Sequence, residues 1–278
     1  MPYTRFCRFA VKKAVFILLL IINLHAMSAV SHAADFAVTS PWVGAIASFI
    51  GGDKVHVRYL SVWNDKGMVA SVGRPRSSEI VIALDADDAA RFRIGRKAKN
   101  LRLLYEKLPM TGEQLRSAFF DPAILPFIAQ NIMKIMAEED KKRYSFYQRR
   151  LAEFQSRVES TIDIGRHLLS KTNILDATGA QGTWIRSAVR GAVRPPASVW
   201  NSWVSGDTAS IKAAFDEAKN RKWLILMDPW TPEQIRNVAA AYDNRMTLAP
   251  PVYGMEYFVY LHEIFLSIWN KTKVAAPK

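Results

Sequence analysis

The chain has 278 residues, a formal net charge of +13 and a single cysteine. This length fits one large domain or two lobes of ordinary size, and it can bury a core without covalent cross-links. Because the cysteine is Cys7, close to the N-terminus, the rest of the chain forms no disulfide and offers no thiolate metal ligand.

Residues 1–33 have the pattern of a secretory signal peptide. Basic residues precede an apolar run at 14–24, and Ser31-His32-Ala33 has the small-x-small pattern that a signal peptidase recognises. The run is shorter than the about 20 apolar residues that a membrane-spanning helix needs, so an uncleaved anchor is the less favoured alternative. We therefore expect cleavage before Ala34 and a periplasmic protein. For an exported protein we expect no nucleic-acid partner, and the basic surplus is interpreted as a solvated surface.

Residues 34–138, the predicted N-terminal lobe, alternate strand-like and helical segments. Ser40 and Pro41 have the residue types of a helix N-cap and first turn, and they predict a helix over 42–50 that ends at Gly51-Gly52. Alternating or continuous apolar runs predict strands at 36–39, 54–60, 80–84 and 101–105. This β-α-β order favours a parallel or mostly parallel sheet flanked by helices.

A long helix is predicted to follow this lobe. Asp121-Pro122 predicts the start of a preceding helix, with a capping carboxylate and a proline at the first helical position. From about Lys141 to Lys171, apolar residues recur every three to four positions. Such a helix would be roughly 45 Å long. Residues 139–171 are therefore interpreted as a rigid link between two lobes.

Residues 172–278, the predicted C-terminal lobe, resume the alternation. Strands are predicted at 173–175, 223–227 and 246–248, and helices at 211–219, 232–242 and 255–269. The predicted fold class is α/β, with two lobes that each contain a small, mostly parallel sheet flanked by helices. One long backbone helix joins them.

Several segments carry a family resemblance. They are Phe36-Ala-Val-Thr-Ser-Pro-Trp-Val-Gly-Ala-Ile-Ala, Ile50-Gly-Gly-Asp-Lys-Val-His-Val, Phe119-Phe120-Asp121-Pro122, the stretch from Arg143-Tyr144 to Phe154, and Tyr257 to Trp269. They resemble the first strand, helix and second strand, the W-L-D-P element, the linker helix and the last helix of the solute-binding proteins of zinc and manganese ABC importers. The likeness spans nearly the whole exported part, with few matching residues after Lys171.

The resemblance implies a site in which side chains of both lobes, usually three histidines and a carboxylate, hold one ion. The matching positions of this chain are Asn64 or Asp65, Ser117, Ala177 and Ala249, so it looks like a divergent member without the usual histidine ligands. The scattered histidines of the exported part, His56, His167 and His262, are interpreted as structural. The cofactor is therefore unknown. A divalent metal stays possible, because oxygen ligands suit hard cations and the chain offers Asp65, Asp176, Asp228 and Glu256.

Aromatic residues point to an organic ligand as another possibility. Trp63, Trp184 and Trp230 follow predicted strands or lie in loops expected to face the cleft between the lobes, and aromatic walls with a few polar groups suit an organic molecule. Core packing is the alternative interpretation. The candidate ligand-binding residues are Trp63, Asn64, Asp65, Phe119, Asp176, Thr178, Trp184, Asp228 and Tyr253.

A basic stripe is a further candidate feature. Arg186, Arg190 and Arg194 recur every four residues, which predicts that they line one face of a helix. Such a stripe is either a solvated face or a surface for an anionic ligand, lipid headgroups or an acidic partner.

The predicted function is that of a periplasmic solute-binding protein. It would bind a small ligand or metal ion between its lobes and, as the resemblance implies, deliver it to an inner-membrane ABC permease. No nucleophile with a base beside it and no phosphate-binding loop is present, so we do not expect an enzyme. The alternative is an accessory or scaffold protein that kept the fold, lost metal binding and works with another periplasmic protein.

Overall fold

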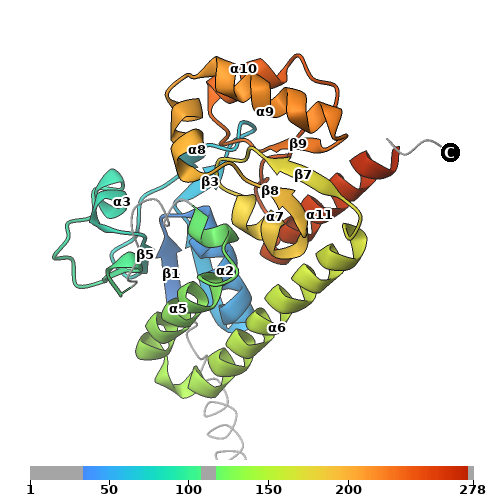
Figure 1. Ribbon diagram of the computed structural model, residues 1–278. Coiled ribbons are helices and arrows are strands. Elements are labelled where there is room, and N and C mark those ends of the chain that lie inside the picture. The colour runs from blue at the N-terminus through green and yellow to red at the C-terminus, as the bar shows by residue number, and fades with distance from the viewer. Residues whose placement is uncertain (1–33, 108–116, 275–278) are drawn as a thin grey trace, which may run out of the picture. The chain divides into compact units, whose positions relative to one another are not determined.

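Two parallel sheets organise the part of the chain that the structure describes (Figure 1). The structure is a computed structural model that describes residues 34–107 and 117–274, so the predicted signal at 1–33 lies outside the described residues. Each sheet has four strands, and a separate two-stranded hairpin follows β2 (Val55–Tyr59). We call residues 34–138 the first lobe and residues 172–278 the second lobe.

The first sheet has the strand order β2-β1-β5-β6, and every neighbouring pair is parallel. After β1 the chain enters α2 (Pro41–Gly51), with Ser40 extended at the N-cap and Pro41 in the first turn, as the sequence predicts. Gly52, with φ +53°, ends the helix. The strands are β1 (Ala34–Val38), β2 (Val55–Tyr59), β5 (Ile80–Ala83) and β6 (Leu101–Leu103).

The remaining elements of the first lobe are short, apart from one helix. The hairpin of β3 (Ser61–Trp63) and β4 (Val69–Ser71) is antiparallel, and α3 (Ala86–Arg91) follows β5. Helix α5 (Leu125–Glu139) begins later than the sequence predicts, so the prediction of a start at Asp121-Pro122 is wrong. The Asp121 carboxylate instead accepts a hydrogen bond from the Ala123 N–H at 2.9 Å, which shapes a turn before the helix.

The predicted long helix is confirmed. A short 3₁₀ turn at Lys141–Arg143 leads into α6 (Tyr144–Leu168). Its buried side chains, among them Tyr147, Phe154 and Val158, follow the predicted apolar spacing. In Figure 1, α6 extends from its end beside α5 towards β7 (Asn173–Asp176), which comes first along the chain among the strands of the second sheet.

The second sheet has the order β10-β9-β7-β8 and is also parallel throughout. This arrangement confirms the predicted fold class. Its strands are β7 (Asn173–Asp176), β8 (Gly191–Val193), β9 (Leu224–Met227) and β10 (Arg245–Thr247). The helices of this lobe are α7 (Gly182–Ala188), α8 (Ala197–Val204), α9 (Thr208–Asn220), α10 (Glu233–Ala239) and α11 (Tyr257–Val274).

The predicted arginine stripe is wrong. Arg186 lies on α7, but that helix ends at Ala188, and Arg194 follows β8. The chain changes from helix to strand within the repeat, so the four-residue spacing does not correspond to one helix face. Arg190 is exposed between the two elements.

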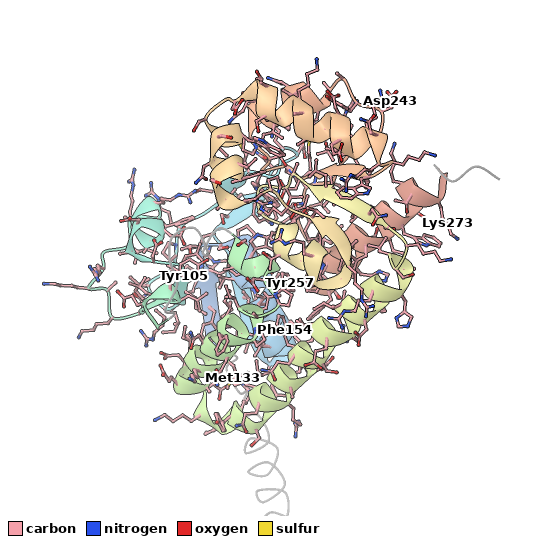
Figure 2. The ribbon with its side chains drawn as sticks, in the orientation of Figure 1. Tyr105, Met133, Phe154, Asp243, Tyr257 and Lys273 are labelled. Atoms are coloured by element: carbon pink, nitrogen blue, oxygen red, sulfur yellow. The ribbon has the colours of Figure 1, made fainter. Side chains whose placement is uncertain are left out.

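The main hydrophobic core continues from one lobe into the other. One cluster of buried residues contains Phe36 of the first sheet, Leu226 of the second sheet and Phe265 of α11. Figure 2 labels Phe154 of α6 and Tyr257 of α11, whose rings stack in this core with centroids 5.9 Å apart. A separate cluster fills the space between the second sheet and helices α8, α9 and α10. Within the described residues, no helix is both long and apolar enough to span a membrane.

Candidate functional site

The structure shows no candidate metal centre: no three side chains of the types His, Cys, Asp or Glu gather into one within the described residues. The histidines lie on different elements. His56 of β2 lies 3.4 Å from the Asp35 carboxylate, and the His167 Nδ1 of α6 lies 2.8 Å from the Asp163 carbonyl oxygen. Ala177, one of the positions that the resemblance assigns to a ligand, is fully buried. The four carboxylates considered for a rebuilt site therefore form no such group.

The Asp228 carboxylate is used in hydrogen bonds within the protein. Its side chain is 0% exposed at the end of β9, where it ties the loop after β7 to the loop after β9. Two carboxylate oxygens offer about four acceptor positions in total. At 2.8–3.1 Å they accept hydrogen bonds from the backbone N–H groups of Gly179, Ala180, Gln181 and Trp230. The carboxylate therefore has little capacity left for a ligand.

Asp176, also 0% exposed, ends the neighbouring strand β7. Its oxygens accept from the Thr178 N–H at 3.0 Å and the Thr178 hydroxyl at 2.6 Å, and they form ion pairs with Arg186 and Arg194. Arg194 also stacks on Trp200, 4.1 Å from the ring centroid. Thr178 and the two arginines line a polar hollow of about 470 Å³ at this edge of the second sheet.

The hairpin carries three of the candidate residues. The Asn64 side-chain oxygen accepts from the Lys66 and Met68 N–H groups, each at 3.0 Å, so it shapes the turn. Asp65 is exposed in that turn. Trp63 meets Trp42 of α2, with ring centroids 5.0 Å apart. Its contact with Trp230 of the second lobe places Trp63 at the boundary between the lobes.

The boundary between the lobes is filled by an aromatic cluster. The Trp63 and Trp230 ring centroids are 6.0 Å apart, and the Phe120 and Trp230 centroids are 5.8 Å apart. The Trp230 Nε1–H donates to the Gly67 carbonyl at 3.2 Å, which links the second lobe to the hairpin. The members of this aromatic cluster are Trp42, Trp63, Phe119, Phe120, Trp230, Tyr257 and Tyr260.

Trp184 lies outside this cluster. It is 0% exposed on α7, stacks on Phe265 with centroids 5.5 Å apart, and donates its indole N–H to the Leu261 carbonyl at 3.2 Å. These contacts make it a packing residue between α7 and α11. It does not line the cavity described next.

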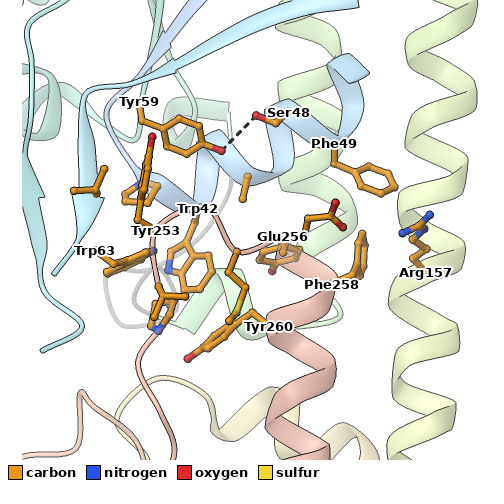
Figure 3. Close-up of a pocket in the computed structure, with 18 of the residues that line it drawn as sticks. Trp42, Ser48, Phe49, Tyr59, Trp63, Arg157, Tyr253, Glu256, Phe258 and Tyr260 are labelled. Carbon is orange, nitrogen blue, oxygen red and sulfur yellow. Dashed lines mark hydrogen bonds between the residues drawn. The ribbon is translucent and has the colours of Figure 1, made fainter. Parts of the chain in front are cut away.

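A cavity of about 450 Å³ lies beside the aromatic cluster. It is bounded by α2, the β2–β3 region, α6 and the segment at 251–260. Figure 3 shows Tyr59 and Tyr253 at one end, Phe258 and Arg157 at the other, and Glu256 between them. The rings that line it are Trp42, Phe49, Tyr59, Trp63, Tyr253, Tyr257, Phe258 and Tyr260, and the polar or charged groups are Ser48, Arg150, Arg157 and Glu256.

Two of the candidate residues, Trp63 and Tyr253, line this cavity. The sequence does not distinguish Trp42, Phe49 or Tyr59 as site residues, because their spacing in a helix or strand is like that of core residues. An available signal was the aromatic stretch from Tyr253 to Tyr260, which lies next to Pro250-Pro251 and before the last helix.

The two arginines of the cavity are bound into its wall. Arg150 donates to the Phe49 carbonyl from Nε at 2.9 Å and from Nη2 at 2.6 Å, and its guanidinium lies 4.3 Å from the Phe49 ring centroid. Arg150 and Arg157 both form ion pairs with Glu153. Glu256, by contrast, has no hydrogen bond or ion pair to its carboxylate from the described residues.

The hydroxyl groups of Tyr59, Tyr257 and Tyr260 are protonated at neutral pH. Burial raises the pKa of Tyr59, although the hydroxyl of Ser48, 3.3 Å away, lowers it in part. Burial also raises the pKa of Tyr257 and Tyr260. The Tyr257 hydroxyl donates to the Phe119 carbonyl, and the Tyr260 hydroxyl donates to the Ala249 carbonyl at 3.0 Å. The cavity is therefore an uncharged aromatic surface, apart from the two arginines and Glu256.

Comparisons with known proteins agree with this fold. No protein-family model and no curated protein matches the chain. A manganese-bound periplasmic metal-binding protein from Candidatus Liberibacter asiaticus has 12% identity and a TM-score of 0.58, with 85% of this chain and 98% of that one covered. ZnuA has 18% identity and a TM-score of 0.57, with 86% and 98% covered.

A third solved structure is the solute-binding protein FpvC from Pseudomonas aeruginosa in complex with Mn²⁺. It has 15% identity and a TM-score of 0.57, with 87% of this chain and 99% of that one covered. At such low identities the likeness shows the fold alone. The chain has the fold of periplasmic metal-binding receptors, while its described residues lack a metal-binding group.

Proposed function

We propose that this protein is a periplasmic solute-binding protein that binds a small organic molecule in the aromatic cavity. The observation that carries the proposal is the cavity of about 450 Å³, which is lined by rings and by few polar groups. Sites for organic ligands are typically about 300–1,000 Å³ and mainly apolar, with a few polar groups that fix orientation. The absence of a metal-binding group from the described residues supports an organic ligand over a bare ion.

In this proposal the protein acts as a receptor without catalysis. The signal-like segment at 1–33 directs export, and an inner-membrane ABC permease takes up the bound solute. Three observations support this role: the sequence resemblance, the fold and the periplasmic binding proteins among the solved structures of similar fold.

The aromatic cluster favours a second candidate function, that of an accessory or scaffold protein. Rings from both lobes close the boundary at which the resemblance implies an ion, and the Trp230 indole is hydrogen-bonded to the hairpin. A protein that kept the fold and lost its ligand would have such a closed boundary. Its partner would then be another periplasmic protein.

Native mass spectrometry distinguishes these functions. The protein is purified from its own periplasm without chelators, and we expect an organic mass bound to the wild type. Tyr253→Ala should release it, because Tyr253 is 69% exposed, lines the cavity and contributes little to the core. Tyr144→Ala is the matched control, since Tyr144 is 47% exposed on α6 and does not line the cavity. A bound divalent ion would overturn the organic ligand, and a bare protein would favour the accessory role.

A further inference from the structure

We infer that the ligand of the aromatic cavity is a small organic cation, whose charged group lies against the rings of Tyr59, Trp63 and Tyr253 and is paired with Glu256. This inference rests on the proposed function, because it assigns a charge to the solute that the cavity would bind. It is carried by the distribution of charges and rings around the cavity.

The first observation is the unpaired carboxylate. Glu256 is an exposed residue that lines the cavity just before α11, and none of the described residues gives its carboxylate a hydrogen bond or an ion pair. The acidic groups of the neighbouring edge differ, because Asp176 and Asp228 have all their partners inside the protein. The Glu256 carboxylate therefore stays available to a ligand that carries a positive charge.

The second observation is the position of the cations already present. Arg150 and Arg157 lie over the Phe49 ring at 4.3 and 5.2 Å from its centroid, and Arg157 lies 6.0 Å from that of Phe258. Both arginines share Glu153, so they are neutralised in part and held at one end of the cavity. Rings therefore already hold cations in this wall, which is the interaction expected between a guanidinium and a π face.

The other end of the cavity has the same kind of rings without a cation. Tyr59 and Tyr253 meet edge to face with centroids 6.4 Å apart, and Trp63 lines the same cavity. Among the described residues no Lys or Arg stacks on any of these three rings. Aromatic rings around a space with an unpaired carboxylate beside it suit an ammonium or quaternary ammonium group. Figure 3 shows Glu256 between this end and Arg157.

Calorimetric titration with three probes of similar shape tests the charge. The probes are choline, the neutral 3,3-dimethylbutan-1-ol and the anionic 3,3-dimethylbutanoate. We expect choline to bind about tenfold more tightly than the neutral alcohol, which is a typical gain for a cation held by rings and one carboxylate. Equal or tighter binding of the alcohol or the anion would overturn the inference, and so would no binding of choline.

Glu256→Gln tests the role of the carboxylate. It should reduce the choline affinity about threefold and leave the affinity for the neutral alcohol unchanged, because it removes the part of the preference that is due to the carboxylate and keeps the part that is due to the rings. Glu263→Gln is the matched control, since Glu263 is an exposed residue of α11 outside the cavity. Circular dichroism checks that both variants fold. An unchanged choline affinity in Glu256→Gln would overturn the pairing.

The charge of the natural ligand tests this inference separately from the proposed function. The compound released from natively purified protein should migrate as a cation in electrophoresis at neutral pH. A released compound that is neutral or anionic would overturn the inference and leave the proposed function standing. If the purified protein carries a metal ion or nothing, the proposed function fails, and the choline titration still decides whether the cavity binds cations.

Discussion

The edge of the second sheet where β7 and β9 end and the aromatic cavity both contain carboxylates. Those at the sheet edge have partners inside the protein, and the one in the cavity has none among the described residues. At the sheet edge, Asp176 and Asp228 are fully buried, and their oxygens are occupied by arginines, a threonine hydroxyl and backbone N–H groups. In the cavity, Glu256 has no partner and Tyr253 is 69% exposed. A polar network with all its hydrogen bonds made is rigid, whereas a group without a partner is free to bind.

This difference indicates that the carboxylates at the sheet edge contribute to stability, whereas the cavity residues contribute to ligand binding. From the residue types alone, these three acidic residues and Asp65 were candidates for one rebuilt metal site. Their surroundings divide them, because a buried carboxylate that already accepts four N–H groups cannot gain a ligand without losing those bonds. Substitutions at the sheet edge should therefore reduce stability, and substitutions in the cavity should reduce binding.

The largest effect on stability is expected from Asp228→Ala. It leaves the backbone N–H groups of Gly179, Ala180, Gln181 and Trp230 without their acceptor in a buried environment. We expect a loss of about 3 kcal/mol in the free energy of unfolding, since each unsatisfied buried donor is costly. Urea denaturation measures it.

Asp65→Ala is the control for this prediction, because Asp65 is exposed in the hairpin turn. Its effect should stay within about 0.5 kcal/mol, as for most surface substitutions. If Asp228→Ala kept the stability of the wild type but lost the ligand, Asp228 would belong to the binding site and the division would fail.

The sequence predicts the regular part of this fold well. Strands such as β5 and β9 are continuous apolar runs, and α6 has the spacing of one buried face, so local patterns determine both. Local patterns fail where a short polar side chain competes with the helix. Asp121 bonds to the nearby backbone in a turn, and the helix begins only at Leu125. The hairpin at 61–71 has strands of three residues, too short to give a pattern.

The cavity was less predictable than the fold because its walls come from distant parts of the chain. Trp63 and Tyr253 stood out as aromatic residues in loops, whereas Tyr59 alternates with polar residues like any strand residue. No spacing in the sequence shows that Tyr59 and Tyr253 meet. The state of each carboxylate was equally hidden, because it depends on donors that folding brings together.

A smaller effect is expected where the second lobe is bonded to the hairpin. Trp230→Phe keeps the ring beside Trp63 and Phe120 but removes the indole N–H that donates to the Gly67 carbonyl. We expect a loss of about 1 kcal/mol, the net contribution of one hydrogen bond. Backbone hydrogen exchange in the hairpin should become faster, because the variant loses one of the contacts that hold the hairpin against the second lobe. The packing of Gly67 beside Pro229 and Pro250 remains.

Trp223→Phe is the matched control for this prediction. Trp223 is half-buried in the second lobe, and no hydrogen bond from its indole N–H is found among the described residues. This variant should leave hydrogen exchange in the hairpin unchanged. Equal exchange rates in Trp230→Phe and the wild type would mean that ring packing alone holds the hairpin against the second lobe.

The smallest expected effect depends on pH and concerns a glutamate that is paired inside the protein, Glu79. Glu79 is buried, and its carboxylate accepts from the Arg58 Nε at 2.6 Å and from the Arg76 N–H at 2.6 Å. The hydrogen bond from Arg58 lowers the pKa of Glu79, although burial opposes the shift. A pKa that is lower in the folded state stabilises the protein at pH values above the unfolded pKa.

This stabilisation should be lost as the pH falls from about 4.5, the ordinary pKa of a glutamate, through the lower folded pKa. Glu79→Gln removes the titrating group, so the urea midpoint of this variant should decline less steeply over that range than the wild-type midpoint. If the Glu79→Gln midpoint declined as steeply as the wild-type midpoint, the hydrogen bonds to the Glu79 carboxylate would contribute nothing to stability, and the contrast between a bonded network and a free carboxylate would not hold.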